Sequence, residues 1–275
     1  MSKIWFVTGS SRGLGRDIVE AALAAGDSVV ATARKPADLD AVVAQYGDRV
    51  FPLALDVTDA RAAQAAVLRA KEHFGRIDVV VNNAGYANIA SVEDITIEDL
   101  TQQVQTNFFG VAYVSKAVLP ILREQGHGHI FQIASIGARI ATPGLSAYQA
   151  AKFAVRGFSL ALAQEMAPLG VKVTTIEPGG IRTDWAGSSM KIPPISAPYE
   201  QTVGAFAKMI RESSGHQSSD PARIASLIGD LANREDAPTE LLVGVDAVEY
   251  AKQAAEILSE NDRKWRSLSI TTAAD

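Results

Sequence analysis

Tyr148 and Lys152, four residues apart, stand out among the side chains that could do acid–base chemistry. In a helix this spacing brings two side chains onto one face, about 5–6 Å apart at Cβ. A nearby ammonium favours the phenolate, so Lys152 is expected to lower the pKa of Tyr148 from about 10 towards neutrality. Ser135, thirteen residues before Tyr148, adds a hydroxyl that could donate a hydrogen bond to a reacting oxygen. Such pairs arise often by chance, so their meaning depends on the rest of the chain.

A glycine cluster near the start of the chain supplies that context. The run Thr8–Gly15 follows a short apolar segment and opens a helical pattern, with three residues and then one residue between its glycines. Glycines let the backbone approach a pyrophosphate, and the start of a helix offers free N–H groups and a positive dipole end. Because the cluster lies between a strand and a helix, it indicates a dinucleotide site. Together with Tyr148 and Lys152 it points to hydride transfer.

The composition is that of a soluble globular chain and excludes several other kinds of site. The chain has 275 residues, of which 47% are hydrophobic and 21% charged, a net charge of −5 and no cysteine. The acidic balance argues against a general nucleic-acid surface, and the lack of cysteine excludes disulfides, zinc–thiolate sites and cysteine nucleophiles. The four histidines lack metal-ligand spacing, so no metal is expected, and His127 and His129 are predicted to lie in an exposed Gly-rich turn. No run is long and apolar enough for a membrane span, no signal-peptide pattern is present, and a cytoplasmic protein is expected.

Short apolar runs alternate with Ala-rich helical stretches, a pattern typical of βαβ units with a parallel sheet. The predicted strands are Ile4–Thr8, Ser28–Thr32, Val50–Leu55, Ile77–Val81, His129–Ala134, Val171–Glu177 and Leu241–Val245. The predicted helices are Leu14–Ala25, Leu39–Tyr46, Ala60–Phe74, Asp99–Gln125 and Ala147–Ala167. The whole chain, 1–275, is therefore expected to be one α/β domain.

The alternation of strands and helices is interrupted between Arg182 and Asp220. This stretch is rich in Ser, Gly and Pro but also carries aromatic and aliphatic side chains. Insertions of this length in compact domains are often functional. Disordered segments usually contain few aromatic and aliphatic residues, so this composition argues against disorder. We expect a substrate lid over residues 184–215. A surface excursion packed only for stability is the alternative.

The ordered motifs of the chain closely resemble those of the short-chain dehydrogenase/reductase family, in its non-extended branch. The resemblance runs from Lys3 to about Thr183, and the motifs that carry it are Thr8–Gly15, Asp56-Val57, Asn82-Asn83-Ala84-Gly85, Asn107, Ser135, Tyr148 with Lys152, and Pro178-Gly179. It implies a single Rossmann-type domain: a doubly wound, seven-stranded, mostly parallel sheet with helices on both faces.

The resemblance also implies which residues bind the cofactor. Asp56 would accept a hydrogen bond from the adenine amino group, and the Ile181 backbone and Thr183 hydroxyl would hold the nicotinamide carboxamide, whereas Asn82 is expected to be structural. The expected cofactor-binding residues are Gly9, Ser11, Arg12, Gly13, Leu14, Gly15, Arg34, Asp56, Val57, Asn83, Ala84, Gly85, Tyr148, Lys152, Pro178, Gly179, Ile181 and Thr183.

The identity of the cofactor is predicted from the residues after the second strand. NAD enzymes usually carry an acid there for the ribose 2′-OH, whereas an arginine accommodates a 2′-phosphate. Ala33 occupies the position of the acid, Arg34 follows it, and Arg12 lies in the glycine turn. Two guanidiniums around a phosphate make charge-assisted hydrogen bonds, so NADP is the expected cofactor. The alternative is that both arginines are merely solvated.

The expected catalytic residues are Asn107, Ser135, Tyr148 and Lys152. By the resemblance, Tyr148 is the general acid or base, and Lys152 lowers its pKa and binds the nicotinamide ribose. Ser135 donates to the substrate oxygen, and Asn107 holds a water that links Lys152 to solvent. The expected partner is a fairly apolar carbonyl or alcohol substrate.

The last part of the chain resembles, more loosely, hydroxysteroid- and retinol-dehydrogenase-like members with an added C-terminal helix. Val248, Ala251, Ala255 and Leu258 share one face, which predicts a helical extension over about 246–266, followed by a frayed end. Such a helix could obstruct subunit pairing through the final strand, and a homodimer is left open.

Two other functions compete with a carbonyl reductase or alcohol dehydrogenase. One is a regulator that senses NADPH without turnover, which has no need of Tyr148. The other is an isomerase or dehydratase like those of the extended branch, which the glycine spacing and the lack of a larger C-terminal substrate domain disfavour.

Overall fold

The computed structural model of the protein describes residues 2–187 and 190–273. Its strands are β1 Ile4–Val7, β2 Ser28–Ala33, β3 Val50–Ala54, β4 Val79–Asn82, β5 Gly128–Ile133, β6 Val171–Pro178 and β7 Glu240–Val243. Its α-helices are α1 Gly13–Ala24, α2 Asp40–Tyr46, α3 Ala60–Phe74, α4 Ile97–Val104, α5 Gly110–Gln125, α6 Ser146–Met166, α7 Ala205–Glu212, α8 Pro221–Leu231 and α9 Val245–Ser269.

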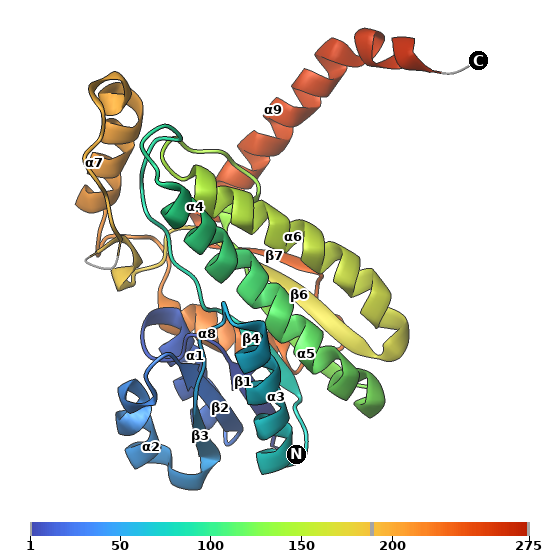
Figure 1. Cartoon of the computed structure of the whole chain (residues 1–275). Helices are drawn as coiled ribbons and strands as arrows, with labels where there is room; N and C mark the ends of the chain where they lie inside the picture. Colours follow the sequence, from blue (N-terminus) through green and yellow to red (C-terminus); the bar gives the residue numbers. More distant parts are fainter. Residues whose placement is uncertain (1, 188–189, 274–275) are drawn as a thin grey trace.

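The strands form one seven-stranded sheet in the order β3-β2-β1-β4-β5-β6-β7, and every strand pair within it is parallel (Figure 1). The order reverses direction between β1 and β4, as in doubly wound folds. The predicted Rossmann-type architecture is confirmed, and the sheet is parallel throughout the described strands rather than mostly so.

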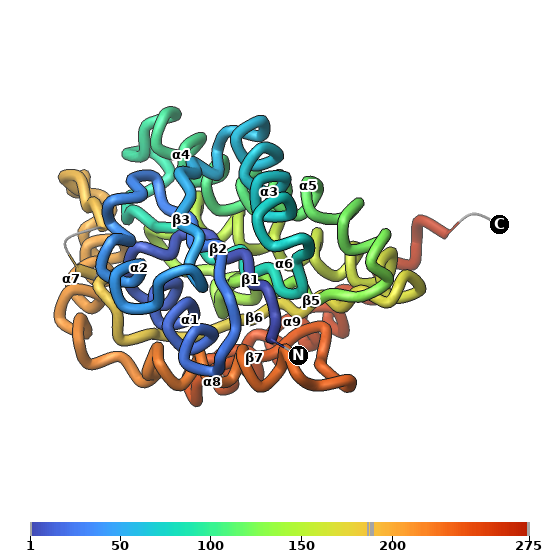
Figure 2. The backbone as a smooth tube through the Cα atoms, turned by 90° about the horizontal axis from the view of Figure 1, so that it is seen from below, coloured from blue at the N-terminus to red at the C-terminus, as the bar shows by residue number. Residues whose placement is uncertain are grey.

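The strand register sorts the core onto the two faces of the sheet. Phe6 lies beside Val30 and Val80, Val80 beside Ile130, and Ile130 beside Val173, so all five point to the same face. There they pack with residues of α3, α5 and α6, while their neighbours along each strand pack on the other face with α1, α2 and α8. Figure 2 shows the sheet between these two helical layers. Because both faces are covered, the strands read as continuous apolar runs rather than as alternating ones.

The predicted helix Asp99–Gln125 is interrupted in the structure. It starts at Ile97 and contains a π-helical turn, Gln105–Phe109, between α4 and α5. The side-chain amide of Asn107 donates to the carbonyl oxygen of Gln103 at 2.9 Å and so competes with the regular backbone ladder. Single π turns of this kind occur often at functional sites.

Three other predictions need correction. His129 lies on β5, as the predicted strand His129–Ala134 implies, but it is not in an exposed turn: it is only 3% exposed, and its Nε2 is 2.8 Å from Thr174 Oγ1. Helix α8 was not predicted, although Asp220 caps it and Pro221 occupies its first position. Helix α9 continues to Ser269, beyond the predicted end and into the segment expected to be frayed.

Among the described residues, no helix has the length and hydropathy needed to cross a bilayer.

Candidate functional site

The predicted site residues lie at the ends of the sheet strands or in the segments that follow them, in the π turn before α5, and on α6. In a parallel sheet the carboxyl ends of the strands meet at one edge, and ligands of doubly wound folds bind at that edge where the strand order reverses. The segments after β1, β2, β3, β4, β5 and β6 carry the predicted residues.

The glycine turn after β1 is built for close backbone contact. Gly9 and Gly13 have φ of 68° and 54°, the left-handed region that side chains rarely adopt. A Cβ on Gly15 would lie 2.2 Å from the carbonyl oxygen of Gly9 and 2.4 Å from Nδ2 of Asn83. Larger residues at these positions would open the turn, so the glycines are needed for its shape.

Hydrogen bonds fasten this turn to the end of β4. The Thr8 hydroxyl accepts from the backbone N–H of Asn83 at 2.9 Å and of Ala84 at 3.0 Å. The Asn83 side chain donates to the carbonyl oxygens of Thr8 and Gly9. Asn82 instead points into the core and donates to Gln132 and Ser115, as its expected structural role requires.

The start of α1 has the properties of an anion site. The cap residue, Arg12, makes no side-chain cap hydrogen bond, and no acidic residue lies in the first turn. The first N–H groups of a helix have no partner within the helix, and their dipole end is positive. Ser11, Gly13 and Leu14 lie in or next to this turn. The backbone can therefore bind the pyrophosphate of a dinucleotide.

Two exposed arginines extend from neighbouring backbone positions beside this turn. Ser10 of the turn donates its N–H to the carbonyl oxygen of Thr32 at 2.9 Å, which places the turn against the end of β2. Arg12 is two residues after Ser10 and Arg34 two residues after Thr32, and both are exposed. Neither guanidinium forms a hydrogen bond or ion pair with another residue of the described ranges, so both can bind a ligand.

Arg16 is a residue of this region that the sequence reasoning missed. Its Nη2 donates to the carbonyl oxygen of Ser11 at 3.3 Å and to that of Asp38 at 2.7 Å, and so connects the glycine turn to the loop after β2. A basic residue one turn into the helix was the available signal. Arg16 therefore joins the backbone next to Arg12 to the loop that follows Arg34.

The remaining predicted cofactor residues lie along the same edge. Asp56, after β3, is exposed, and its Oδ1 accepts from the N–H and the hydroxyl of Thr58. Val57 is buried beside Gly110, where a Cβ would lie 2.7 Å from Val57 Cγ2. Val57 therefore packs the start of α5 against the site edge.

The segment after β6 closes the other side of the site. Pro178 ends β6, and the N–H of Gly179 donates to the carbonyl oxygen of Val243 at 3.0 Å. Ile181 forms a β-bridge with Ser219. A Cβ on Gly13 would lie 3.7 Å from the side chain of Thr183, so this segment reaches the glycine turn.

Tyr148, Lys152 and Ser135 come together between α6 and the end of β5. Lys152 Nζ lies 5.6 Å from the centre of the Tyr148 ring and donates to the carbonyl oxygen of Ile133 at 2.7 Å. The Tyr148 phenol hydrogen-bonds to Ser135, whose Oγ also accepts from the N–H of Gly137 at 3.0 Å. The predicted proximity of the three side chains is thus found in the structure.

The acidities of this pair differ from the expectation. Burial raises the pKa of Tyr148 to about 12, and the hydrogen bond to Ser135 only partly opposes this effect. Burial also lowers the pKa of Lys152 to about 8. The expected lowering of the tyrosine pKa is therefore not found. Burial destabilises the charged phenolate more than the neighbouring groups stabilise it. At neutral pH the phenol holds its proton.

Asn107 reaches the same place from the π turn. Its Nδ2 donates to the carbonyl oxygen of Tyr86 at 2.8 Å, and its Oδ1 accepts from the N–H of Tyr86 at 3.2 Å. A Cβ on Gly85 would lie 2.6 Å from Asn107 Oδ1 and 3.6 Å from Lys152 Nζ. A Cβ at position 85 would collide with Asn107, so the glycine leaves room for this side chain next to Lys152.

The predicted lid, of which residues 188–189 lie outside the described part, packs against the Tyr148 end of the site. The Trp185 ring centre lies 5.5 Å from that of Tyr148, and Met190 is buried in one cluster with Tyr148 and Leu145. Two hydrogen bonds join Lys191 to the loop after β4: its carbonyl oxygen accepts from the N–H of Ile89 at 3.0 Å, and its N–H donates to the side-chain Oδ1 of Asn88 at 3.0 Å. The segment gives this end of the site apolar walls.

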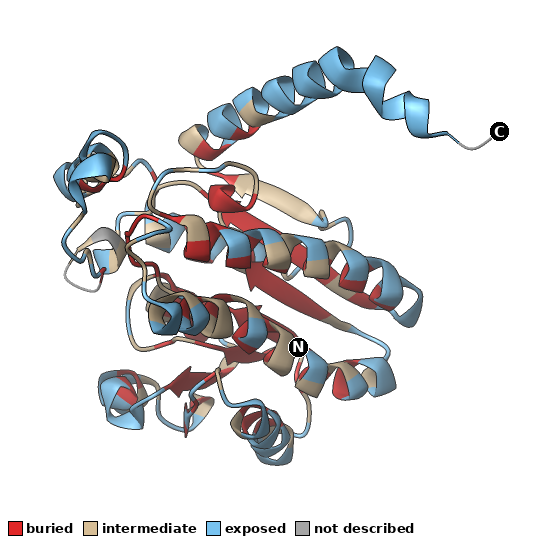
Figure 3. Ribbon diagram, turned by 45° about the horizontal axis from the view of Figure 1, so that its top comes forward, coloured by how far each residue is buried: buried red, intermediate tan, exposed pale blue. Residues whose placement is uncertain are grey.

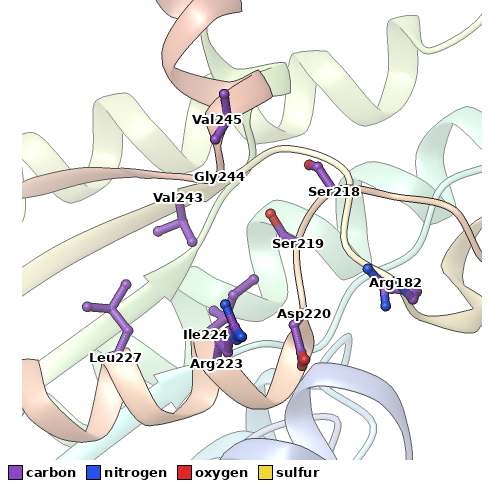
Figure 4. Close-up of a pocket in the computed structure, with 10 residues that line it drawn as sticks. All are labelled: Arg182, Ser218, Ser219, Asp220, Arg223, Ile224, Leu227, Val243, Gly244 and Val245. Carbon is purple, nitrogen blue, oxygen red and sulfur yellow. The ribbon is translucent and has the colours of Figure 1, made fainter.

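A separate hollow of about 450 Å³ lies between α8, the end of β7 and the root of α9 (Figure 4). Its lining contains none of the predicted site residues: Arg182, Ser218, Ser219, Asp220, Arg223, Ile224, Leu227, Val243, Gly244 and Val245. It is therefore distinct from the site around Tyr148.

Comparisons with known proteins agree with this geometry. The model of the short chain dehydrogenase family matches residues 3–192. Oxidoreductase BOA17 of Botryotinia fuckeliana is 61% identical over 274 residues, 99% of this chain and 100% of that protein. A 3-ketodihydrosphingosine reductase of Bacteroides thetaiotaomicron is 32% identical and covers 88% of each chain.

Solved structures show the same likeness. A short-chain dehydrogenase from Streptomyces avermitilis has a TM-score of 0.92 at 35% identity, covering 100% of this chain and 99% of that one. A short-chain dehydrogenase from Burkholderia cenocepacia in complex with NADP has a TM-score of 0.75 at 27% identity, covering 96% and 97%. A 3-ketoacyl-(acyl-carrier-protein) reductase from Brucella melitensis complexed with NADH has a TM-score of 0.74 at 26% identity, covering 88% and 96%.

These structural relatives bind nicotinamide dinucleotides of both kinds. The glycine turn, the uncapped start of α1 and the Tyr148–Lys152 pair of this chain fit such a cofactor. The chain belongs to the short-chain dehydrogenase/reductase family and is an oxidoreductase.

Proposed function

We propose that the protein is an NADP(H)-dependent carbonyl reductase or alcohol dehydrogenase that acts on an apolar small molecule. The observation that carries this proposal is the buried Tyr148 phenol, hydrogen-bonded to Ser135 and next to the Lys152 ammonium, at the cofactor edge of the sheet. A protonated phenol in that position is a general acid for a carbonyl oxygen.

In the proposed reduction, Ser135 and Tyr148 hold the substrate oxygen by hydrogen bonds. NADPH, when bound, would supply the hydride that reduces the carbonyl carbon. The Tyr148 hydroxyl transfers its proton to the oxygen, which completes the alcohol and leaves a phenolate. The Lys152 ammonium beside the ring stabilises this phenolate, because an opposite charge in a buried site favours the charged form.

The phenolate must then recover a proton from solvent. Lys152 and Asn107 both lie next to Gly85, and we assign this route to them. In alcohol oxidation the same groups act in reverse, with Tyr148 as the base. Because burial raises the pKa of Tyr148 to about 12, the phenol carries at neutral pH the proton that the reduction step requires.

The glycine turn and the start of α1 would hold the pyrophosphate, and Arg12 and Arg34 the 2′-phosphate. Asp56 would bind the adenine, and Ile181 and Thr183 the carboxamide. For the substrate we assign an apolar carbonyl compound, since Trp185, Met190 and Leu145 surround the Tyr148 end. The names of two relatives, a 3-ketodihydrosphingosine reductase and a 3-ketoacyl-(acyl-carrier-protein) reductase, also denote the reduction of keto compounds.

The test is a screen of ketones and aldehydes of graded chain length with the full-length protein, with NADPH oxidation and alcohol formation both measured. We expect one alcohol formed for each NADPH oxidised, with the highest efficiency for apolar ketones. Tight NADPH binding without turnover of any compound would instead favour the non-catalytic NADPH-sensing regulator. Product formation without net NADPH oxidation would favour the isomerase or dehydratase.

A further inference from the structure

Helix α9 leaves the body of the protein after its first two turns. Ala247 and Ala251 are buried, whereas all residues from 255 to 273 are exposed. Figures 1 and 3 show the helix running outward from the end of β7 with solvent around its outer half. An isolated helix gains little stability in water, since most helical stability in proteins comes from packing an apolar face. The outer half of α9 therefore lacks the contacts that normally stabilise such a helix.

The exposed part of α9 carries an apolar stripe on one face. The stripe continues the buried face of Ala247 and Ala251 at spacings of three and four residues, which is the pattern of a helix face that packs. Its large members are between 48% and 72% exposed: Tyr250, Ile257, Leu258, Trp265 and Leu268. Solvated helices do not usually present so many large apolar side chains in one line.

Asn261 is the one polar residue near the middle of this stripe, and the stripe is nearly symmetric about it. Ile257 lies four residues before Asn261 and Trp265 four residues after it, while Ala254 lies seven before and Leu268 seven after. A two-fold axis at Asn261 would place Ile257 against the partner's Trp265 and the small Ala254 against the partner's Leu268. It would also let the two Asn261 amides hydrogen-bond to each other, as single buried asparagines do in paired helices.

We propose that α9 is a dimerisation arm, and that the arms of two copies of this chain pack antiparallel and cross near Asn261. Such a contact uses the same surface on both copies, and its two-fold symmetry limits the assembly to a dimer. Helix α9 ends at Ser269, so a two-fold axis at Asn261 pairs residues 253–269 of the two copies, about 25 Å at the usual rise per residue.

The charges of the arm favour the antiparallel direction. The half before Asn261 carries Lys252, Glu256 and Glu260, whereas the half after it carries Asp262, Arg263, Lys264 and Arg266. The first half is thus acidic and the second basic. Antiparallel pairing brings the acidic half of one copy near the basic half of the other, whereas parallel pairing would align like charges.

The same charges argue against a lipid bilayer as the occupant of the stripe. Helices that lie on membranes have polar faces rich in Lys and Arg. In α9 the acidic side chains Asp246, Glu249, Glu256, Glu260 and Asp262 outnumber the basic ones, and the whole chain has a net charge of −5. A second copy of the chain fits the stripe better than an anionic surface does.

The first test is the mass of the full-length protein in solution by sedimentation equilibrium. We expect a reversible dimer that dissociates at least tenfold more readily in Ile257→Glu and in Trp265→Glu. Lys252→Glu, on the opposite face of the same helix, is the matched control and should leave the dimer intact. A monomeric wild-type protein, or a dimer that Ile257→Glu and Trp265→Glu leave unchanged, would overturn the proposal.

The second test fixes the direction of pairing and uses the absence of cysteine from the natural sequence. Under oxidising conditions, Asn261→Cys should form a disulfide dimer, because two-fold-related residues at the crossing approach within disulfide range. Leu268→Cys alone should not, but a mixture of Ala254→Cys and Leu268→Cys proteins should form the mixed dimer. Ready self-linking of Leu268→Cys would indicate parallel arms and contradict the proposal. So would monomers that bind vesicles of anionic phospholipid through the stripe.

Discussion

The buried carboxylate of Glu177 accepts a hydrogen bond from Nε of Arg139, directly beneath the active-site edge of the sheet. Arg156 lies 3.4 Å from the same carboxylate and 2.5 Å from that of Glu240, which Arg139 also approaches at 3.3 Å. Arg139 follows the Ser135 turn, Arg156 is one helical turn beyond Lys152, and Glu177 precedes Pro178. The four charges therefore connect the three segments that carry Ser135, Lys152 and the Pro178 turn.

Glu177→Gln should destabilise the protein strongly. The substitution removes the charge from hydrogen bonding with Arg139, and a hydrogen bond to a charged group contributes about 1.5–3 kcal/mol. We expect urea unfolding to show a loss of this order and turnover to fall more than NADPH affinity, because Ser135 and Lys152 lose their common support. Asp236→Asn removes the exposed partner of Arg234 and should leave the unfolding midpoint near that of the wild type. A stable Glu177→Gln protein with normal turnover would show that the cluster positions nothing.

Tyr148→Phe should abolish turnover while cofactor binding persists. The variant keeps the buried ring but has no proton to transfer, and general acid–base groups contribute about 10²–10⁴-fold. We expect at least a 10²-fold loss of turnover, with an NADPH fluorescence titration close to that of the wild type. Tyr113→Phe, on α5 away from Ser135, is the matched control. Retained turnover in a folded Tyr148→Phe variant would refute the proposed mechanism.

The wild-type protein should prefer NADPH to NADH. Hydrogen bonds to charged groups contribute about 1.5–3 kcal/mol each, so even one guanidinium on the 2′-phosphate gives a bias of at least about tenfold. Arg34→Asp should weaken NADPH binding and improve the relative use of NADH. Lys116→Asp, an equal charge change on the exposed side of α5, should leave the ratio unchanged. Equal catalytic efficiencies with both cofactors in the wild type would contradict the NADP assignment.

His129 should make the stability depend on pH. Burial lowers its pKa to about 3 from the ordinary value of 6.5, so below pH 6.5 the unfolded chain binds a proton that the folded protein does not. The stability contribution is complete above pH 6.5 and is lost as the pH falls towards 3. Between about pH 7 and about pH 5 this loss should amount to about 2 kcal/mol.

Urea unfolding at both pH values measures this effect as a difference between variants. His129→Gln cannot take up the proton and should show a smaller loss than the wild type, whatever the other groups contribute. His127→Gln, two residues away and exposed, should keep the wild-type difference. Equal losses in wild type and His129→Gln would show that the burial of His129 has no such consequence.

Local sequence signals predicted the sheet and most of the site. The glycines of the turn and the four-residue spacing of Tyr148 and Lys152 were sufficient to predict the cofactor turn and the catalytic pair. Both features depend on backbone geometry within a few residues. The same holds for the apolar runs of the strands, which are buried on both faces of the sheet.

Properties that depend on distant packing were not predicted. The pKa values of Tyr148 and His129 follow from burial, which segments far along the chain produce. The glycine-rich sequence around His129 suggested an exposed turn, although the predicted strand begins there; Val79 of β4 and Lys172 of β6 pair with His129 in the sheet and so bury it. The outer half of α9 was predicted as far as about residue 266 from its apolar positions at helical spacing, whereas the last turn, to Ser269, was expected to be frayed.

The segment 184–215 should act as a lid that sets an apolar substrate preference. It begins directly after Thr183, and its Met190 and Phe206 belong to the cluster that packs on the Tyr148 ring. We expect the described part of the segment to gain protection from hydrogen exchange when NADPH and a ketone bind, since lids close over bound substrate.

Met190→Ala and Phe206→Ala should both change the efficiency profile across a series of ketones of increasing chain length, because each removes part of an apolar wall. Met209→Ala is the matched control: Met209 lies in the same segment but is 54% exposed, and its removal should leave the profile unchanged. The competing view is that the segment only packs on the surface or serves a subunit contact. Unchanged protection together with wild-type profiles in both wall variants would establish that view instead, because a wall that touches the substrate cannot be shortened without altering which chain lengths fit.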